Sequence, residues 1–122
     1  MVLVDTSVWG RHFRSGDDHL GELLLAGEAL VHPAVIAELA LSNLRERATT
    51  LSLLQHLPHA RAARDDEVMA MVANLSLHGR GIGWIDSHLI ASALLTGCDL
   101  WTVDRPLVAA ALHAHVRVHP QD

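Results

Sequence analysis

Lysine is absent from this sequence of 122 residues, and all nine of its basic residues other than histidine are arginines. The absence excludes a P-loop NTPase, whose GxxxxGK motif requires a lysine. It also excludes a phospho-receiver domain, which needs a lysine near its acidic pocket. The chain is therefore neither a P-loop NTPase nor a phospho-receiver domain.

Cysteine and long apolar runs are scarce too. Cys98 is the only cysteine, which excludes an internal disulfide and suits a reducing compartment. No apolar run approaches the ~20 residues that span a bilayer, and no basic segment precedes an apolar stretch at the N-terminus. We therefore expect a cytoplasmic protein without a membrane span.

Several catalytic signatures are also missing. The sequence has no Asp-x-Asp, which counts against an aspartyl-phosphate phosphatase, and no serine in the GxSxG setting of a hydrolase. The ten histidines are scattered, without the spacing of zinc ligands. The glycine-rich stretch GRGIG at 79–83 lacks GxGxxG spacing and follows a predicted helix, so it does not indicate a dinucleotide site.

The balance of charge is acidic, with a formal net charge of −5. Proteins that bind nucleic acid without sequence preference are usually basic, so this balance argues against such a function. The argument weakens if several acids share one metal site, because the bound cation offsets their charge.

Short apolar runs alternate with helical patterns along the chain. Strands are expected at 2–4, 29–32, 100–103 and 116–118, with a weak one at 60–63. Helices are expected at 6–13, 20–26, 33–44, 48–56, 65–78, 85–96 and 106–113. The strands are apolar runs rather than polar–apolar alternations, which indicates a mainly parallel sheet covered on both faces. We predict a single α/β domain over residues 1–122.

Four acids stand in apolar surroundings, whereas the other acids have polar neighbours. Asp5 and Asp104 each follow a predicted strand, and Glu38 and Asp86 are the only charges in their apolar segments. In a parallel sheet, Asp5 and Asp104 would emerge at the carboxyl ends of the strands, where open α/β folds bind ligands. Capping is the alternative: Asp86 could cap a helix, and Asp104 could open a turn.

Four carboxylates at one sheet edge repel one another unless a cation is present. Oxygen ligands without histidine or cysteine select a hard ion, Mg²⁺ or Mn²⁺. Such an ion lowers the pKa of a bound water to make a nucleophile and offsets charge on a phosphodiester. The residues therefore predict metal-dependent hydrolysis of a phosphoryl ester, with nucleic acid as the substrate.

The chain resembles PIN-domain ribonucleases of the VapC type, the toxins of prokaryotic toxin–antitoxin pairs, over essentially its whole length. The matching stretches are VLVDTSVW at 2–9, AVIAEL at 34–39, GIGWIDSHLIASAL at 81–94 and GCDLWTVD at 97–104. The resemblance implies a PIN-like three-layer α/β/α sandwich. It also implies an endoribonuclease dependent on Mg²⁺ or Mn²⁺ that cleaves structured RNA, such as tRNA, with a metal-activated water.

The resemblance also assigns residues and partners. It makes Asp5, Glu38, Asp86 and Asp104 the metal ligands and catalytic acids, and it places Ser7 and Thr102 where hydroxyls orient those carboxylates; ordinary turn or strand-end hydroxyls are the alternative for these two. It implies a homodimer and an antitoxin protein that blocks the acidic pocket. A non-catalytic PIN-like module that binds RNA or protein is one alternative function, and a small metal-dependent phosphatase is another.

One stretch departs from the family pattern. Many relatives carry a further acid and an aromatic after the last motif aspartate, whereas Arg105, Pro106 and Leu107 follow here. Arg105 could reach substrate phosphate or be a surface cation. Asp99 could assist Asp104, although we favour a surface turn.

Apolar helix surface gives indirect support for a protein partner. Five leucines exceed what one small core needs, although ordinary core packing explains any one of them equally well; they are Leu20, Leu23, Leu24, Leu51 and Leu54. Trp9 is expected to pack in the core.

Overall fold

A parallel sheet of three strands forms the centre of the computed structural model, which describes residues 1–120. The strands are β1 (Val2–Val4), β2 (Ala29–Leu30) and β3 (Asp99–Trp101), in the order β2-β1-β3. Leu3 of β1 lies opposite Leu30 on one side and Leu100 on the other. β1 is buried along its whole length, as its apolar sequence predicted.

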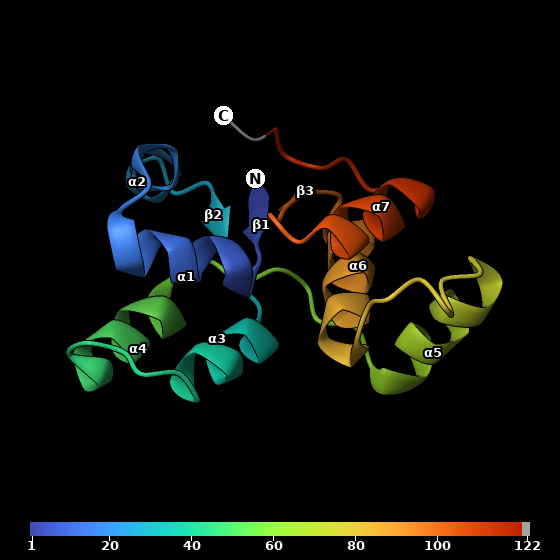
Figure 1. Ribbon diagram of the computed structural model, residues 1–122, viewed down its shortest axis with the longest axis horizontal. Helices are drawn as coiled ribbons and strands as arrows, with labels where there is room; N and C mark the ends of the chain where they lie inside the picture. Colours follow the sequence, from blue (N-terminus) through green and yellow to red (C-terminus); the bar gives the residue numbers. More distant parts are fainter. Residues whose placement is uncertain (121–122) are drawn as a thin grey trace.

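Seven helices surround this sheet within the described residues. They are α1 (Thr6–Ser15), α2 (Asp18–Leu25), α3 (Pro33–Ala40), α4 (Arg47–His56), α5 (Asp65–Asn74), α6 (Trp84–Thr96) and α7 (Arg105–His113). Figure 1 shows α1 to α4 on one side of the strands and α5 to α7 on the other. The predicted three-layer α/β/α sandwich is therefore confirmed.

The predictions of strands at 60–63 and 116–118 are wrong, because each region forms only an isolated bridge. The first is an isolated bridge that joins His59 to Val31 in parallel, one residue before the predicted start. The chain then leaves the sheet because the Arg61 amide donates to the Thr96 hydroxyl at the end of α6.

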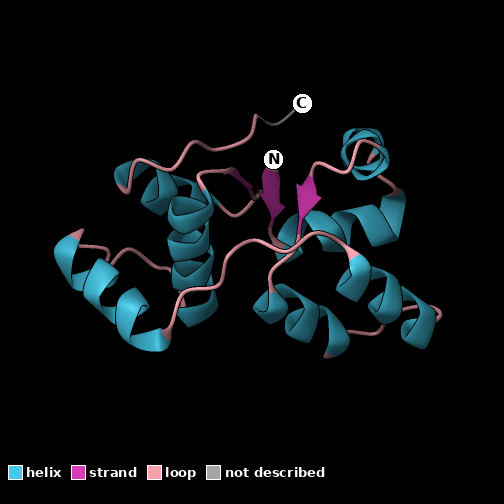
Figure 2. Ribbon diagram, turned by 180° about the vertical axis from the view of Figure 1, so that it is seen from behind, coloured by secondary structure: helices cyan, strands magenta, loops and turns pink. Residues whose placement is uncertain are grey.

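The second is an isolated bridge between Val118 and Leu100. The Val116 amide instead donates to the Ala111 carbonyl at the end of α7, so pairing begins only at residue 117. Pro120 has no amide hydrogen with which to extend the ladder. Figure 2 accordingly draws this C-terminal segment as a loop beside the sheet.

The core fills the space between the sheet and both helical layers. Trp9 is buried as expected, and Trp101 is buried with it. Leu20, Leu23 and Leu54 are also buried, and Leu24 and Leu51 pack against the same core. Ordinary core packing, the alternative for each of these leucines, therefore describes them, with Leu24 and Leu51 partly buried at its edge.

Within residues 1–120, no helix has both the length and the apolar character needed to cross a bilayer.

Candidate functional site

The four isolated acids reach one edge of the sheet from four different elements. Asp5 directly follows β1 and begins α1, and Asp104 follows β3 and begins α7. Glu38 belongs to α3, and Asp86 lies in the first turn of α6. In Figure 1, β1 runs toward the level of α3 and the first turn of α6. The carboxyl ends of the strands therefore face the helices that carry Glu38 and Asp86.

Asp5 is the most buried of these acids, with an exposed fraction of 6%. One of its oxygens, Oδ2, accepts three hydrogen bonds: from the Ser7 hydroxyl at 2.7 Å, the Thr102 hydroxyl at 2.8 Å and the Ser7 amide at 3.3 Å. These donors satisfy a carboxylate oxygen that is buried away from water. They also fix the orientation of the group and leave Oδ1 outside these three bonds.

The same two hydroxyls join the ends of β1 and β3. The Ser7 oxygen accepts from the Val103 amide at 3.1 Å, and the Thr102 oxygen accepts from the Asp104 amide at 3.1 Å. The two oxygens lie 3.3 Å apart. Ser7 and Thr102 therefore couple the position of Asp5 to the backbone at Asp104.

Glu38 is held by Thr6, the first residue of the helix predicted at 6–13, to which the sequence assigned no role in the site. The Thr6 hydroxyl donates to Glu38 Oε1 at 2.6 Å, and this bond links α1 to α3. A hydroxyl directly after Asp5 was the sequence signal for it. Its partner lies 32 residues further along the chain, so only the packing of α1 on α3 identifies the contact.

Capping, the alternative for Asp86 and Asp104, describes part of what these residues do. Asp104 caps α7, where its Oδ2 accepts from the Leu107 amide at 3.3 Å. Asp86 is the third residue of α6 rather than its cap, and its Oδ2 accepts from the Gly83 amide at 3.2 Å. These bonds fix Oδ2 of each carboxylate and leave the other oxygen outside them.

The electrostatics of Asp86 show that the four acids act on one another. Burial raises the pKa of Asp86, and repulsion from Asp5, Asp104 and Glu38 raises it further, against the lowering effect of the Gly83 amide. Within residues 1–120, however, no group of three or more His, Cys, Asp or Glu side chains is arranged to hold a metal ion. The carboxylates are therefore close enough to affect the pKa of Asp86, but they do not form such a group.

The remaining two candidates lie in different surroundings. Arg105 is exposed in the first turn of α7, next to Asp104. Asp99 begins β3, at the opposite end of the strand from Thr102, and forms an ion pair with Arg117 at 2.7 Å. Asp99 is therefore not brought to the acids, and it is a half-buried strand residue rather than the surface turn residue that we favoured.

Comparison with known proteins identifies the family. The sequence model of the PIN domain matches residues 2–111. The chain is 45% identical over 117 residues to Ribonuclease VapC32 of two strains of Mycobacterium tuberculosis, CDC 1551 / Oshkosh and ATCC 25618 / H37Rv. In each case the match covers 95% of this chain and 94% of the relative.

Two solved structures share the fold at low sequence identity. PAE2754 from Pyrobaculum aerophilum has a TM-score of 0.59 at 21% identity, covering 89% of this chain and 78% of that one. FitAB bound to an IR36 DNA fragment has a TM-score of 0.64 at 18% identity, covering 98% and 94%. Sequence and fold agree: this chain belongs to the PIN-domain family and, within it, to the VapC-type ribonucleases.

Proposed function

We propose that this protein is the toxin of a cytoplasmic toxin–antitoxin pair, an endoribonuclease that requires Mg²⁺ or Mn²⁺ and cleaves structured RNA such as tRNA. The observation that carries the proposal is the convergence of Asp5, Glu38, Asp86 and Asp104 at the carboxyl edge of the sheet, where three of them raise the pKa of the fourth. The 45% identity to a named ribonuclease over 95% of the chain supports it independently.

The donor set fits a hard divalent cation. All four side chains are carboxylates, which suit Mg²⁺ or Mn²⁺ rather than zinc or copper. Asp5, Glu38, Asp86 and Asp104 would hold the ion, and their mutual repulsion favours its binding. When bound, such an ion lowers the pKa of a water molecule and offsets negative charge on a phosphodiester.

The chain's own contribution is to hold these carboxylates in place before the substrate arrives. Ser7 and Thr102 fix Asp5 through one oxygen, so the other stays available. Thr6 holds Glu38 through one oxygen in the same way. The Gly83 amide restrains Asp86. These hydrogen bonds therefore orient each of the three carboxylates and leave its second oxygen outside them.

An antitoxin that covers the acidic pocket, a homodimer and a phosphate contact from Arg105 complete the proposal. They follow from the relationship to VapC-type toxins and from the exposed position of Arg105 beside Asp104. An antitoxin is expected to oppose the acids with a cation of its own, because four carboxylates attract positive charge.

The test is cleavage of total RNA by the purified protein with Mg²⁺, with Mn²⁺ and with EDTA. Asp5→Asn and Asp86→Asn should each reduce cleavage by roughly 100-fold or more while the protein stays folded, because each removes a charged ligand. Asp18→Asn, the same change at an exposed residue of α2, is the matched control and should cleave like the wild type. Sequencing of the cleavage sites then identifies the RNA.

Metal binding is measured separately by thermal unfolding with and without Mg²⁺ or Mn²⁺. The wild type should be stabilised by either ion, and Asp86→Asn should not. Full cleavage by Asp5→Asn or Asp86→Asn would remove the acids from the mechanism. A wild type that neither binds metal nor cleaves RNA would be a non-catalytic module, and hydrolysis of a simple phosphomonoester without RNA cleavage would indicate a phosphatase.

A further inference from the structure

A groove begins beside the acids and runs along α1. Its first part, about 560 Å³ in volume, is lined by Thr6 and Ser7 at one end and by Arg14 at the other. Its second part, about 490 Å³, continues from Arg14 to Arg45. The two parts share four lining residues, namely Phe13, Arg14, Asn43 and Leu44. They therefore form one continuous groove that leads away from the residues that hold Asp5 and Glu38.

One face of α1 lines this groove from end to end. Thr6, Gly10 and Arg14 are four residues apart and therefore share a face of the helix. Thr6 and Arg14 are separated by about 12 Å along the helix axis. A Cβ atom on Gly10 would lie 3.3 Å from Arg14 Nη1. The guanidinium therefore folds back over Gly10, toward the acids, in space that a side chain at residue 10 would restrict.

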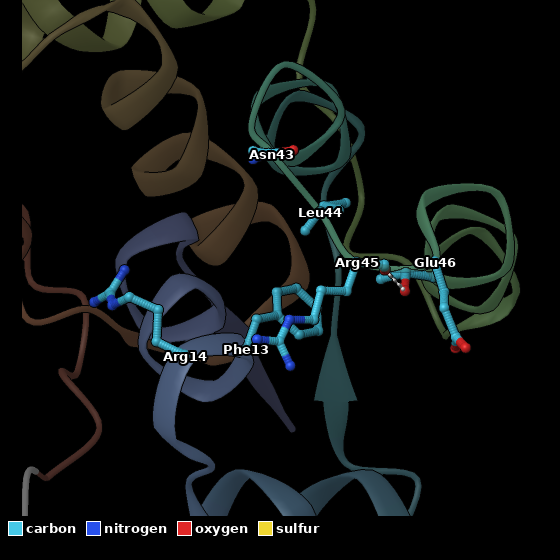
Figure 3. Close-up of a pocket in the computed structure, with 7 residues that line it drawn as sticks. Phe13, Arg14, Asn43, Leu44, Arg45 and Glu46 are labelled. Carbon is cyan, nitrogen blue, oxygen red and sulfur yellow. Dashed lines mark hydrogen bonds between the residues drawn. The ribbon is translucent and has the colours of Figure 1, made fainter.

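The two arginines of the groove carry uncompensated charge. Arg14 and Arg45 are exposed, and within residues 1–120 neither forms an ion pair with a carboxylate, unlike Arg11, which is 2.9 Å from Asp17. Glu46 also lines the groove, but Figure 3 shows Glu46 and Arg14 pointing away from each other on opposite sides of Phe13. Both guanidinium groups are therefore available to an anion.

Phe13 lines both parts of the groove, together with Arg14. Its ring stacks on Trp9 at 5.8 Å, which fixes it, while 39% of the residue stays exposed. An exposed aromatic ring flanked by arginines is the usual arrangement for single-stranded nucleic acid, because bases stack on the ring and phosphates bind the cations.

We propose that this groove binds a single-stranded segment of the RNA substrate, with Arg14 and Arg45 on its phosphates and Phe13 against a base. The assignment rests on the proposed ribonuclease function and names the path by which the strand reaches the acids. A chain with a net charge of −5 and no lysine needs local arginines to attract RNA. The groove supplies them along a path that begins beside Thr6 and Ser7.

The test measures binding of a fluorescein-labelled, unstructured RNA of roughly 12 nucleotides at several salt concentrations, with Ca²⁺ in place of Mg²⁺ and the RNA checked for cleavage. Arg14→Gln and Arg45→Gln should each raise Kd roughly three- to tenfold and reduce the slope of log Kd against log salt by roughly 0.7. Arg61→Gln is the matched control, because Arg61 is also exposed but lies at the far end of α6, beside Thr96. It should bind like the wild type.

A charge-neutral variant tests the geometry. Gly10→Ala adds one methyl group against Arg14 Nη1 and should weaken RNA binding, though less than Arg14→Gln does. Alanine also favours the helix, so the variant should fold.

The outcomes separate this inference from the proposed function. If the wild type cleaves RNA and the Arg14 and Arg45 variants bind it as Arg61→Gln does, the groove assignment is overturned and the ribonuclease function stands. If the wild type cleaves no RNA but these variants lose RNA binding, the function fails and the groove assignment stands. Variants that bind RNA normally but no longer bind the antitoxin would assign the groove to the protein partner instead.

Discussion

At the scale of single residues, two hydroxyls decide how the acidic site is built. Thr102 is fully buried, donates to Asp5 and accepts from the Asp104 amide, and Ser7 repeats this pattern with the Val103 amide. A hydroxyl is the side-chain group that can donate to a carboxylate and accept from an amide at once. These residues therefore serve the geometry of Asp5 and Asp104, and we assign them a positioning role.

Replacing Thr102 with valine keeps its shape and removes its hydrogen bonds to Asp5 and to the Asp104 amide. We expect Thr102→Val to lower the rate of RNA cleavage roughly 10- to 100-fold, because it frees Asp5 Oδ2 from one of its donors and weakens metal binding. Thr102→Ser, which keeps the hydroxyl, should recover most of the lost rate.

Cleavage rates are compared across a metal titration, so a weakened site shows as a higher metal requirement. Thr96→Val, the same substitution at the end of α6, is the control and should leave this requirement unchanged. Equal metal requirements in Thr102→Val and the wild type would show that the hydroxyl has no positioning role.

At the scale of elements, α3 depends on an unusual cap. Pro33 is its first residue, as predicted, but the cap is His32, whose Nδ1 accepts from the Ala34 amide at 2.9 Å. Burial, together with the charges of His88 and His59, lowers the pKa of His32 to about 4. An imidazolium has no free lone pair, so protonation removes the cap from the helix that carries Glu38.

His32 therefore makes stability depend on pH. Its pKa is about 4 in the folded protein, below the ordinary value of 6.5, so the unfolded chain binds more protons between these two values. The contribution of His32 to the free energy of unfolding is complete above about pH 6.5 and falls as the pH drops from 6.5 toward 4, by about 3 kcal/mol. His32→Asn supplies a cap that does not titrate.

The free energy of unfolding is measured with urea at several pH values for the wild type and for His32→Asn. Because the acids titrate in both proteins, their contribution cancels in the difference. The free energy of unfolding of the variant should change less between pH 6.5 and 4. His78→Asn, at an exposed histidine, should retain the slope of the wild type. Parallel curves for wild type and His32→Asn would contradict the role of His32.

At the scale of the whole molecule, the last described residues complete the sheet beyond β3. The Leu100 amide donates to the Arg117 carbonyl and the His119 amide donates to the Leu100 carbonyl, at 3.0 and 2.8 Å. The ring of His119 stacks on His19 at 4.9 Å and lies 5.2 Å from Trp101. This segment lies outside the residues matched by the family model, yet it ties α2 to β3.

Removing residues 116–122 should therefore destabilise the fold rather than the chemistry. We expect a loss of about 3 kcal/mol, from the burial of Val116 and two sheet hydrogen bonds, and a fall in Tm of roughly 10 °C. Cleavage well below the Tm should persist, because the acids lie at the opposite ends of the strands.

Arg117→Gln is the control for this truncation. It removes an ion pair whose arginine side chain is 84% exposed, which therefore adds little to stability, and it leaves the backbone bonds in place. A truncated protein with the Tm of the wild type would show that the segment adds nothing to the sheet.

The sequence predicted the main strands, all seven helices and the four acids, because apolar runs and isolated charges are local signals. It misplaced the two edge strands, since pairing there depends on amides already engaged by Thr96 and Ala111. It also missed His32 as a cap and Thr6 as the partner of Glu38, because histidine is an uncommon cap and the Thr6 contact spans 32 residues.

By itself, then, the sequence determined the fold class and singled out Asp5, Glu38, Asp86 and Asp104 as acids in apolar segments, since apolar runs leave few places for an acid. Only the tertiary structure decided that Asp5, Glu38, Asp86 and Asp104 act on one another, that the five leucines are core, and that Arg14 and Arg45 share a groove with Phe13. These are distances between residues far apart in the chain, and they are set by the packing of helices on the sheet.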